Sequence, residues 1–358
     1  MRGKVFQEIP GIPENIMSTP GETPRVQPDS GPGRRPLGGG ELLPGLRRIG
    51  SAVLPLLALA VLVGVFGVKE PRFLSVTNLE VMATQGGPLL IISLGATFVV
   101  LMGGIDLSVG AIGALAAAAV AVAITNHGFG SAGLLVAIVV GALAGTVNAF
   151  CVTFLRLPSF IVTLGSLSIF NGVTLHLLNG RALFVDQLPY QNLAIGQTIP
   201  HLPNVALIAV VLWALMLFLN RYTRFGRYLT AIGAGEPVAA LSGIPVRRYK
   251  AAAFIVSGAF AGCAGAFLLL ELGSATPSLG DGYLLDSIAA IVIGGTALMG
   301  GVGGISRTLL GVALLTVLSN GLNVVGVSTF TQSILKGVIV ILAVLLTIDR
   351  GRMQDLIK

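Results

Sequence analysis

The segment AAAFIVSGAFAGCAGAFLLLEL, residues 251–272, decides the class of fold. Its only charged side chain is Glu271, next to its end. The hydrocarbon core of a bilayer is about 30 Å thick, and a helix needs about 20 mainly apolar residues to cross it. Inside hydrocarbon every backbone N–H and C=O must be bonded within the protein. We therefore expect residues 251–272 to form a membrane-spanning α-helix.

Similar apolar runs fill most of the chain. Hydrophobic residues make up 54% of it, charged residues 10%, and the mean hydropathy is +0.90. A soluble domain carries about 25% charged residues, so an all-α, polytopic membrane protein is expected. About ten spans are expected, with ends uncertain by several residues: 49–68, 79–102, 106–125, 131–153, 159–178, 204–220, 251–272, 284–300, 306–325 and 329–348.

The distribution of lysine and arginine predicts the orientation. With both termini in the cytoplasm, 18 of the 22 basic residues lie in or next to cytoplasmic segments, as the positive-inside rule requires. The predicted domains are a disordered cytoplasmic tail over 1–48, rich in proline, glycine and arginine, a membrane domain over 49–350, and a cytoplasmic tail over 351–358. The basic excess thus fits membrane orientation, and no nucleic-acid partner is expected.

Glycine and proline within the spans predict two local features. Gly87 and Pro88 interrupt the second span, which we expect to be a broken helix lining a cavity; a tolerated kink is the alternative. The pairs Gly141–Gly145 and Gly258–Gly262 have the small-xxx-small spacing that lets helix backbones approach closely.

The sequence argues against an enzyme. None of its five lysines follows a Gly-x-x-x-x-Gly stretch, so the chain has no phosphate-binding loop for ATP. Its two cysteines and three histidines form no metal-ligand spacing and no nucleophile–base pair. We expect no metal and no cofactor.

The longest predicted cytoplasmic connection is RYTRFGRYLTAIGAGEPVAALSGIPVRRYK, residues 221–250. Basic residues flank a nearly uncharged middle, Ala231 to Ile244, which predicts a short helix with Glu236 near its start and Gly243 at its end. Such a helix is either a docking element for a partner protein or an ordinary connection.

Four blocks resemble the sugar-importer permeases of ATP-binding-cassette (ABC) transporters, of the ribose, xylose, arabinose and galactoside type, which are similar to branched-chain amino acid permeases. The segment AIGAGEPVAALSGI (231–244) is similar to the family's coupling pattern, roughly AIGGNExAARLSGI. The other blocks are GGIDLSVGA (103–111), LPSFIVTLGSLSI (157–169), and DSIAAIVIGGTALMGGVGGI (286–305) followed by Asn320-Gly321-Leu322. The resemblance covers about 70–348.

The resemblance implies a subunit of a transporter in the bacterial inner membrane. It implies a homodimer or paired permease, two ATP-binding subunits inside, a sugar-binding protein outside, and a monosaccharide as the transported solute. It also implies that residues of the 231–244 block transmit closure of the ATPase; these are Ile232, Gly233, Gly235, Glu236, Ala239, Ser242, Gly243 and Ile244.

The chain departs from the family pattern at several positions. Gly235 stands where asparagine is usual, Ala240 where arginine is usual, Leu284 where glutamate is usual, and Arg307 where glycine is usual. Loss of the first two polar side chains weakens polar contacts to the ATPase or indicates a co-adapted partner.

Polar residues within the spans are candidates for the translocation path. Asp106 is either a functional acid or a helix cap that accepts from the N–H of Ser108 or Val109. Lys336 is expected to extend toward the membrane surface. The remaining candidates bind solute or bond between helices: Gly103, Gly104, Ser108, Asn148, Thr163, Ser166, Asn171, Asp286, Thr296, Asn320, Asn323 and Gln332.

Other transport functions remain open at this point. An ABC permease for a nucleoside or a branched-chain amino acid has a similar architecture. An ion-coupled secondary transporter would carry more intramembrane acids than Asp106, Glu271 and Asp286, which all lie near span ends.

Overall fold

The fold is helical, as the hydropathy predicts. The computed structural model describes residues 43–127, 132–185 and 190–347. The chain divides into two units, Met1–Pro44 and Gly45–Lys358, and the fold described below is that of the second. Most of the expected tail over 1–48 and all of that over 351–358 lie outside the described residues, although α1 already begins at Leu43.

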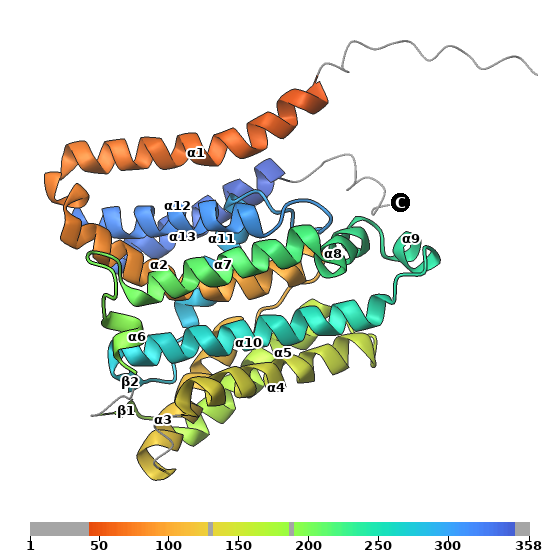
Figure 1. The fold of residues 1–358 in the computed structure, drawn as a ribbon, viewed down its shortest axis with the longest axis horizontal. Coiled ribbons are helices and arrows are strands. Elements are labelled where there is room, and N and C mark those ends of the chain that lie inside the picture. Colours follow the sequence, from red (N-terminus) through yellow and green to blue (C-terminus); the bar gives the residue numbers. More distant parts are fainter. Residues whose placement is uncertain (1–42, 128–131, 186–189, 348–358) are drawn as a thin grey trace, which may run out of the picture. The chain divides into compact units, whose positions relative to one another are not determined.

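The regular elements of the described chain are helices apart from two very short strands (Figure 1). The helices are α1 (Leu43–Lys69), α2 (Val76–Leu101), α3 (Val109–His127), α4 (Gly133–Thr153), α5 (Ser159–Leu177), α6 (Asn192–Ile195), α7 (Asn204–Tyr222), α8 (Arg224–Ala234), α9 (Glu236–Leu241), α10 (Val246–Leu272), α11 (Asp281–Ile293), α12 (Ile305–Val324) and α13 (Thr329–Thr347), with a short 3-10 helix η1 (Pro71–Leu74). The strands β1 (Leu183–Phe184) and β2 (Ser274–Ala275) pair antiparallel.

Seven of the described helices are long and apolar enough to cross a membrane: α2, α3, α4, α5, α7, α10 and α12. Two shorter apolar segments, Pro55–Lys69 and Thr329–Leu342, lie at the first and last expected spans. The chain is therefore a multi-pass membrane protein, and the count of ten spans stays a prediction.

The expected span 284–300 is helical in its first half only. Helix α11 ends at Ile293, and a glycine-rich loop follows up to α12. Five glycines of this loop have positive φ, which L-residues with a side chain rarely adopt; they are Gly295, Gly300, Gly301, Gly303 and Gly304.

The expected break in the second span is wrong. Helix α2 runs through Gly87 and Pro88 without interruption. Pro88 lacks a backbone N–H and so removes one hydrogen bond of the helix. This part of α2 is buried in the bundle, where neighbouring helices allow a proline to be tolerated, and the helix continues. Gly87 has a packing reason, because a Cβ there would lie 2.8 Å from a methyl group of Val205 on α7. The chain breaks its helical course after Leu101 instead.

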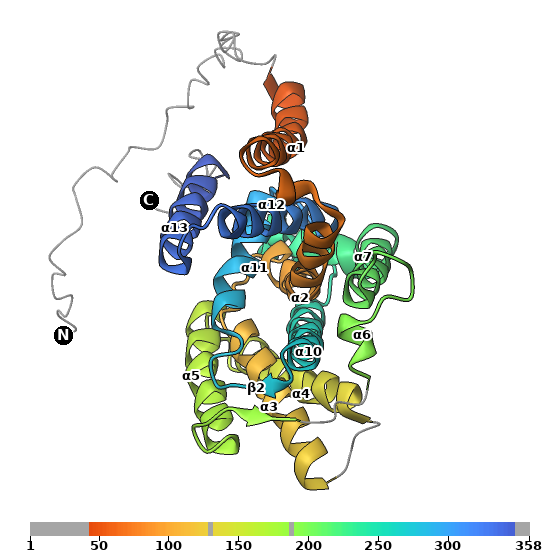
Figure 2. The same cartoon turned by 90° about the vertical axis from the view of Figure 1, so that its left-hand side faces the viewer.

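Helix α10 lies at the centre of the bundle, packed against α2, α3 and α4 (Figure 2). Its contact with α4 is the most extensive between any two of the described elements. Gly258 and Gly262 face Gly141 and Gly145, and a Cβ on Gly258 would overlap the Gly141 carbonyl oxygen. The two small-residue spacings of the sequence thus meet each other, which allows van der Waals contact between the helix backbones.

Connections that the charge rule places on one side of the membrane lie together. At one end of the bundle, the segments after α2, after α4 and before α10 line a common pocket. At the other end, β1 pairs with β2, and the imidazole Nδ1 of His201 lies 2.7 Å from a carboxylate oxygen of Glu80. This arrangement agrees with the predicted alternation of the helices.

Candidate coupling site

The 221–250 connection folds into two helices rather than the single short helix expected over 231–244. Helix α8 begins after Thr223, whose hydroxyl accepts from the Phe225 N–H at 3.1 Å. It ends at Ala234, the next residue Gly235 is extended (φ 175°), and α9 starts with Glu236 in its first turn. Gly243, just beyond α9, has φ +81°, in agreement with a glycine requirement at the helix end.

Aromatic side chains fix α8 to the rest of the bundle. The Phe225 ring lies edge-on to Phe98 of α2, with centroids 5.0 Å apart. Tyr228 makes a similar contact with Tyr249 of α10, at 4.9 Å. Because aromatic pairs of this geometry stabilise packing beyond their buried area, α8 is held to both α2 and α10.

Four glycines lie in contact with one another and with Leu101 where α8 meets the bundle; we call Leu101, Gly103, Gly233, Gly300 and Gly301 the glycine contact. A Cβ on Gly233 would overlap the Leu101 carbonyl oxygen and lie 2.5 Å from the Gly301 nitrogen. The Gly301 N–H donates to that same carbonyl at 2.9 Å. The end of α8 is thus packed directly on the end of α2 and on the loop between α11 and α12.

The predicted coupling residues divide by exposure. Ile232 and Ala239 are buried within the chain, so their side chains position α8 and α9. Gly235 is extended between α8 and α9, Gly243 has the positive φ that favours glycine, and the Ser242 hydroxyl donates to the Val238 carbonyl at 2.9 Å.

The exposed apolar side chains of α9 belong to residues that the sequence did not single out. Val238 is 68% exposed and Leu241 is 90% exposed, although both are apolar. Their exposure could not be read from the sequence, because the register of a six-residue helix gives too short a pattern. Glu236 at the start of α9 pairs with Lys250 of α10, Oε2 to Nζ 2.9 Å.

The family comparison covers the whole of this region. The family model described as the permease component of the branched-chain amino acid transport system matches residues 78–344. This chain belongs to that permease family. The matched range contains the glycine contact, both helices of the connection and all the candidate path residues.

Curated relatives carry the names of sugar permeases. A ribose import permease protein, RbsC, of Bacillus subtilis is 39% identical over 298 residues, covering 82% of this chain and 91% of the relative. RbsC of Escherichia coli K12 is 37% identical (81% and 91%), and the D-allose transport system permease protein AlsC of the same strain is 34% identical (80% and 89%). No solved structure matches the chain.

In this permease three of the predicted path residues form one buried network. Asp106 Oδ1 accepts from the Ser108 N–H at 3.0 Å, as the cap interpretation predicts, and from the Ser108 hydroxyl at 2.6 Å. Asp106 Oδ2 accepts from the Ser257 hydroxyl of α10 at 2.9 Å. Asn148 of α4 donates to the Ser108 hydroxyl at 2.8 Å. The network joins the start of α3 to α4 and α10, and Ser257 is a member that the sequence gave no sign of.

The start of α5 is bonded to the same loop of the permease. The Ile105 N–H donates to the Ser159 hydroxyl at 3.2 Å, and the Thr163 hydroxyl donates to the Ile105 carbonyl at 3.2 Å. Gly103 and Gly104 precede this point, and Gly103 belongs to the glycine contact. Two of the blocks recognised in the sequence, 103–111 and 157–169, are therefore in direct contact.

The other path candidates lie apart from that network. Asn320 exchanges amide hydrogen bonds with Asn78 at 2.8 and 3.1 Å, and exposed Asn323 accepts from Gln332 at 3.0 Å. Thr296 accepts from the Gly304 N–H at 3.0 Å. These side chains therefore bond to other parts of the same chain. The sequence had left open whether they bind solute or bond between helices. Asn171 is half-buried on α5, and Ser166 is buried there.

Lys336 has an ionic partner that the sequence did not predict. Its ammonium lies 2.8 Å from Asp286 Oδ2, with both side chains about one-fifth exposed. Charges inside a membrane protein are costly and pair with one another. The pair joins α13 to α11, and its partners are 50 positions apart in the sequence.

Arg307, where glycine is usual, also has a structural contact. Its guanidinium donates to the Gly295 carbonyl at 2.8 Å. This bond closes the glycine-rich loop on the first turn of α12, so the departure supports the loop instead of disrupting it. Leu284, the other departure on α11, packs against the core.

Proposed function

We propose that this chain is the transport subunit of an ABC importer and forms the membrane path for a monosaccharide. The observation that carries this proposal is the family match over 78–344 together with relatives named for ribose and D-allose import, which align over four-fifths of the chain. The family description names branched-chain amino acids, but the three relatives described above are named as ribose or D-allose permeases. ATP is hydrolysed by a separate subunit.

The finer features belong to the same proposal. The permease pairs with a second copy or a related permease, two ATP-binding subunits and an extracytoplasmic sugar-binding protein. It lies in the bacterial inner membrane with ten spans and both termini in the cytoplasm, as the distribution of basic residues supports. Helix α9 is the docking element for the ATPase, because two of its apolar side chains are exposed.

The test is transport by reconstituted components. The permease, its ATPase and its binding protein are placed in proteoliposomes, and uptake of labelled ribose, allose and leucine is measured. We expect uptake of one of the sugars that requires ATP and the binding protein. Uptake driven by an ion gradient with the permease alone, or uptake of leucine but neither sugar, would contradict the proposal.

Leu241→Glu gives a prediction for the docking element. Leucine and glutamate have similar helix propensity and the side chain is 90% exposed, so the fold should be retained. A carboxylate placed without a partner in an apolar interface is costly to desolvate, so ATPase binding should fall about tenfold or more, which corresponds to about 1.4 kcal/mol. Binding is measured by co-purification and by ATP-driven uptake.

The matched control for that variant is Leu241→Met, which keeps an apolar side chain of similar size. It should bind the ATPase as the wild type does. If Leu241→Glu also assembled and transported normally, α9 would not be the docking element.

A further inference from the structure

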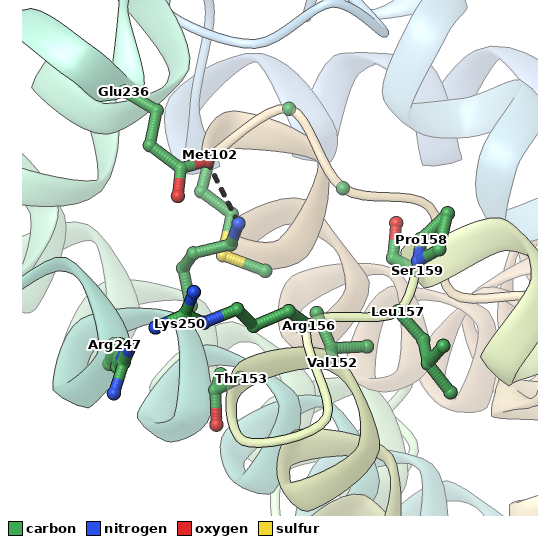
Figure 3. A pocket seen from close by; sticks show the side chains of 12 residues that line it. Met102, Val152, Thr153, Arg156, Leu157, Pro158, Ser159, Glu236, Arg247 and Lys250 are labelled. Carbon is green, nitrogen blue, oxygen red and sulfur yellow. Dashed lines mark hydrogen bonds and ion pairs between the residues drawn. The ribbon is translucent and has the colours of Figure 1, made fainter.

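A pocket of about 480 Å³ lies beside the coupling site and is not accounted for by it. Four segments of the chain line it: the end of α2 with Gly103 and Gly104, the connection from α4 to α5, the start of α9, and the first turn of α10. Figure 3 shows Arg156 extending from the α4–α5 connection toward α10, which carries Arg247 and Lys250.

Positive charge dominates the lining. Arg156, Arg247 and Lys250 face one carboxylate, Glu236, which is paired with Lys250 at 2.9 Å. Among the residues that the structure describes, neither arginine guanidinium has a hydrogen-bond acceptor or an ionic partner. Pro158 and Ser159, at the N-terminus of the 19-residue helix α5, also line the pocket and add the partial positive charge of a helix N-terminus. The pocket is therefore built to attract an anion.

The backbone at Arg156 supports a role for its side chain. Arg156 has φ +57°, in the left-handed region where glycine is free of strain and a residue with a Cβ is not. The turn after α4 requires no side chain at this position. An arginine held in a strained conformation with its guanidinium in a pocket is an outlier of the kind that marks functional positions.

The surroundings of Arg156 are apolar and exposed. Phe154, Leu155 and Leu157 next to it are 72%, 54% and 44% exposed, and Phe160 and Ile161 on the first turn of α5 are 50% and 61% exposed. In a membrane protein such a surface faces acyl chains. A free anion would use the basic pocket alone, whereas a phospholipid uses both the pocket and the apolar surface.

We propose that this pocket binds the phosphate-bearing head group of an anionic phospholipid, whose acyl chains lie against the apolar surface around Arg156. Arginine guanidinium groups bind phosphate oxygens in a bidentate manner. Basic pockets between membrane helices on the cytoplasmic side bind anionic head groups, and this pocket is on the side that the charge rule places in the cytoplasm. The lipid would contact both the coupling segment, through α9 and α10, and the loop that carries Gly103 and Gly104. The inference does not depend on which solute is transported.

The test uses the complete purified chain in detergent without its partners, so it is independent of transport. Native mass spectrometry measures retention of phosphatidylglycerol and of phosphatidylcholine with the same acyl chains. We expect selective retention of phosphatidylglycerol, with Arg156→Gly and Arg247→Gln each lowering it about fivefold, as loss of one basic contact implies. Arg156→Gly also removes the backbone strain, so its melting temperature should equal or exceed that of the wild type.

Arg248→Gln is the matched control, because Arg248 is the exposed neighbour of Arg247 but does not line the pocket. It should change retention by less than about twofold. Equal retention of both lipids, or phosphatidylglycerol retention unchanged in both pocket variants, would overturn the proposal. The proposal would also be overturned if the pocket bound inorganic phosphate instead of the lipid. In that case the pocket variants would lose bound inorganic phosphate but retain phosphatidylglycerol. In a separate co-purification with the ATPase, pocket variants that lose the ATPase but keep phosphatidylglycerol would assign the pocket to an acidic group of the partner and would likewise overturn the proposal.

Discussion

Gly233→Ala should reduce ATP-driven uptake by about tenfold or more while the protein still inserts into the membrane. The added Cβ would overlap the Leu101 carbonyl oxygen and meet the Gly301 nitrogen at 2.5 Å. Neither backbone group can rotate away as a side chain would, and overpacking of this kind costs about 1–3 kcal/mol. The end of α8 must therefore separate from α2 and from the glycine-rich loop. If movement of α9 is transmitted to the membrane helices through the glycine contact, this separation uncouples ATP hydrolysis from transport. The measurements are sugar uptake and ATPase activity.

Two glycine-to-alanine variants control for the chemistry of the change. A Cβ on Gly235 meets only Val238 side-chain atoms, at 3.8 Å and beyond, and its extended backbone accepts alanine, so Gly235→Ala should leave the melting temperature unchanged. Gly165 on α5 has open space around its Cβ position, so Gly165→Ala should leave uptake unchanged. Normal coupling in Gly233→Ala would show that the glycine contact does not transmit motion.

The glycine pairs show how far local sequence can lead. The spacings Gly141–Gly145 and Gly258–Gly262 predict close helix approach, because the period of a helix places both glycines of a pair on one face. The partner of each face is a tertiary property, and only the structure pairs α4 with α10. The same holds for Gly233. The sequence places it in a coupling segment, but the residues that it contacts, Leu101 and Gly301, are distant from it in the sequence.

The wrong expectations have related causes. Gly87-Pro88 is a helix-breaking signal locally, but burial of α2 among its neighbours overrides it. The pairing of Lys336 with Asp286, 50 positions apart, could likewise not be read from the local sequence. The span expected over 284–300 is mainly apolar, yet its second half contains several glycines, and the helix ends before Gly295 and Gly300, which have positive φ. Hydropathy reports burial in an apolar environment and does not report whether the backbone is helical.

Asp106→Ala is the second variant expected to have a large effect. It removes the acceptor of the Ser108 N–H, the Ser108 hydroxyl and the Ser257 hydroxyl at a site where Asp106 is only 3% exposed. A buried donor left without an acceptor costs about 1–3 kcal/mol. We expect a clear drop in melting temperature and loss of most ATP-driven uptake, since the start of α3 loses its hydrogen bond to Ser257 of α10.

Asp106→Asn distinguishes the two roles that the sequence allowed for this residue. The amide keeps one acceptor oxygen for Ser108, and its NH₂ group can donate to the Ser257 hydroxyl, which rotates to accept. If Asp106 works through its hydrogen bonds, Asp106→Asn should retain most of the stability and uptake of the wild type. If the negative charge itself is needed for transport, Asp106→Asn should be as inactive as Asp106→Ala although it is more stable. We expect the first result, because the hydrogen-bond partners of the carboxylate are neutral donors from the chain itself and Asp106 does not line the basic pocket.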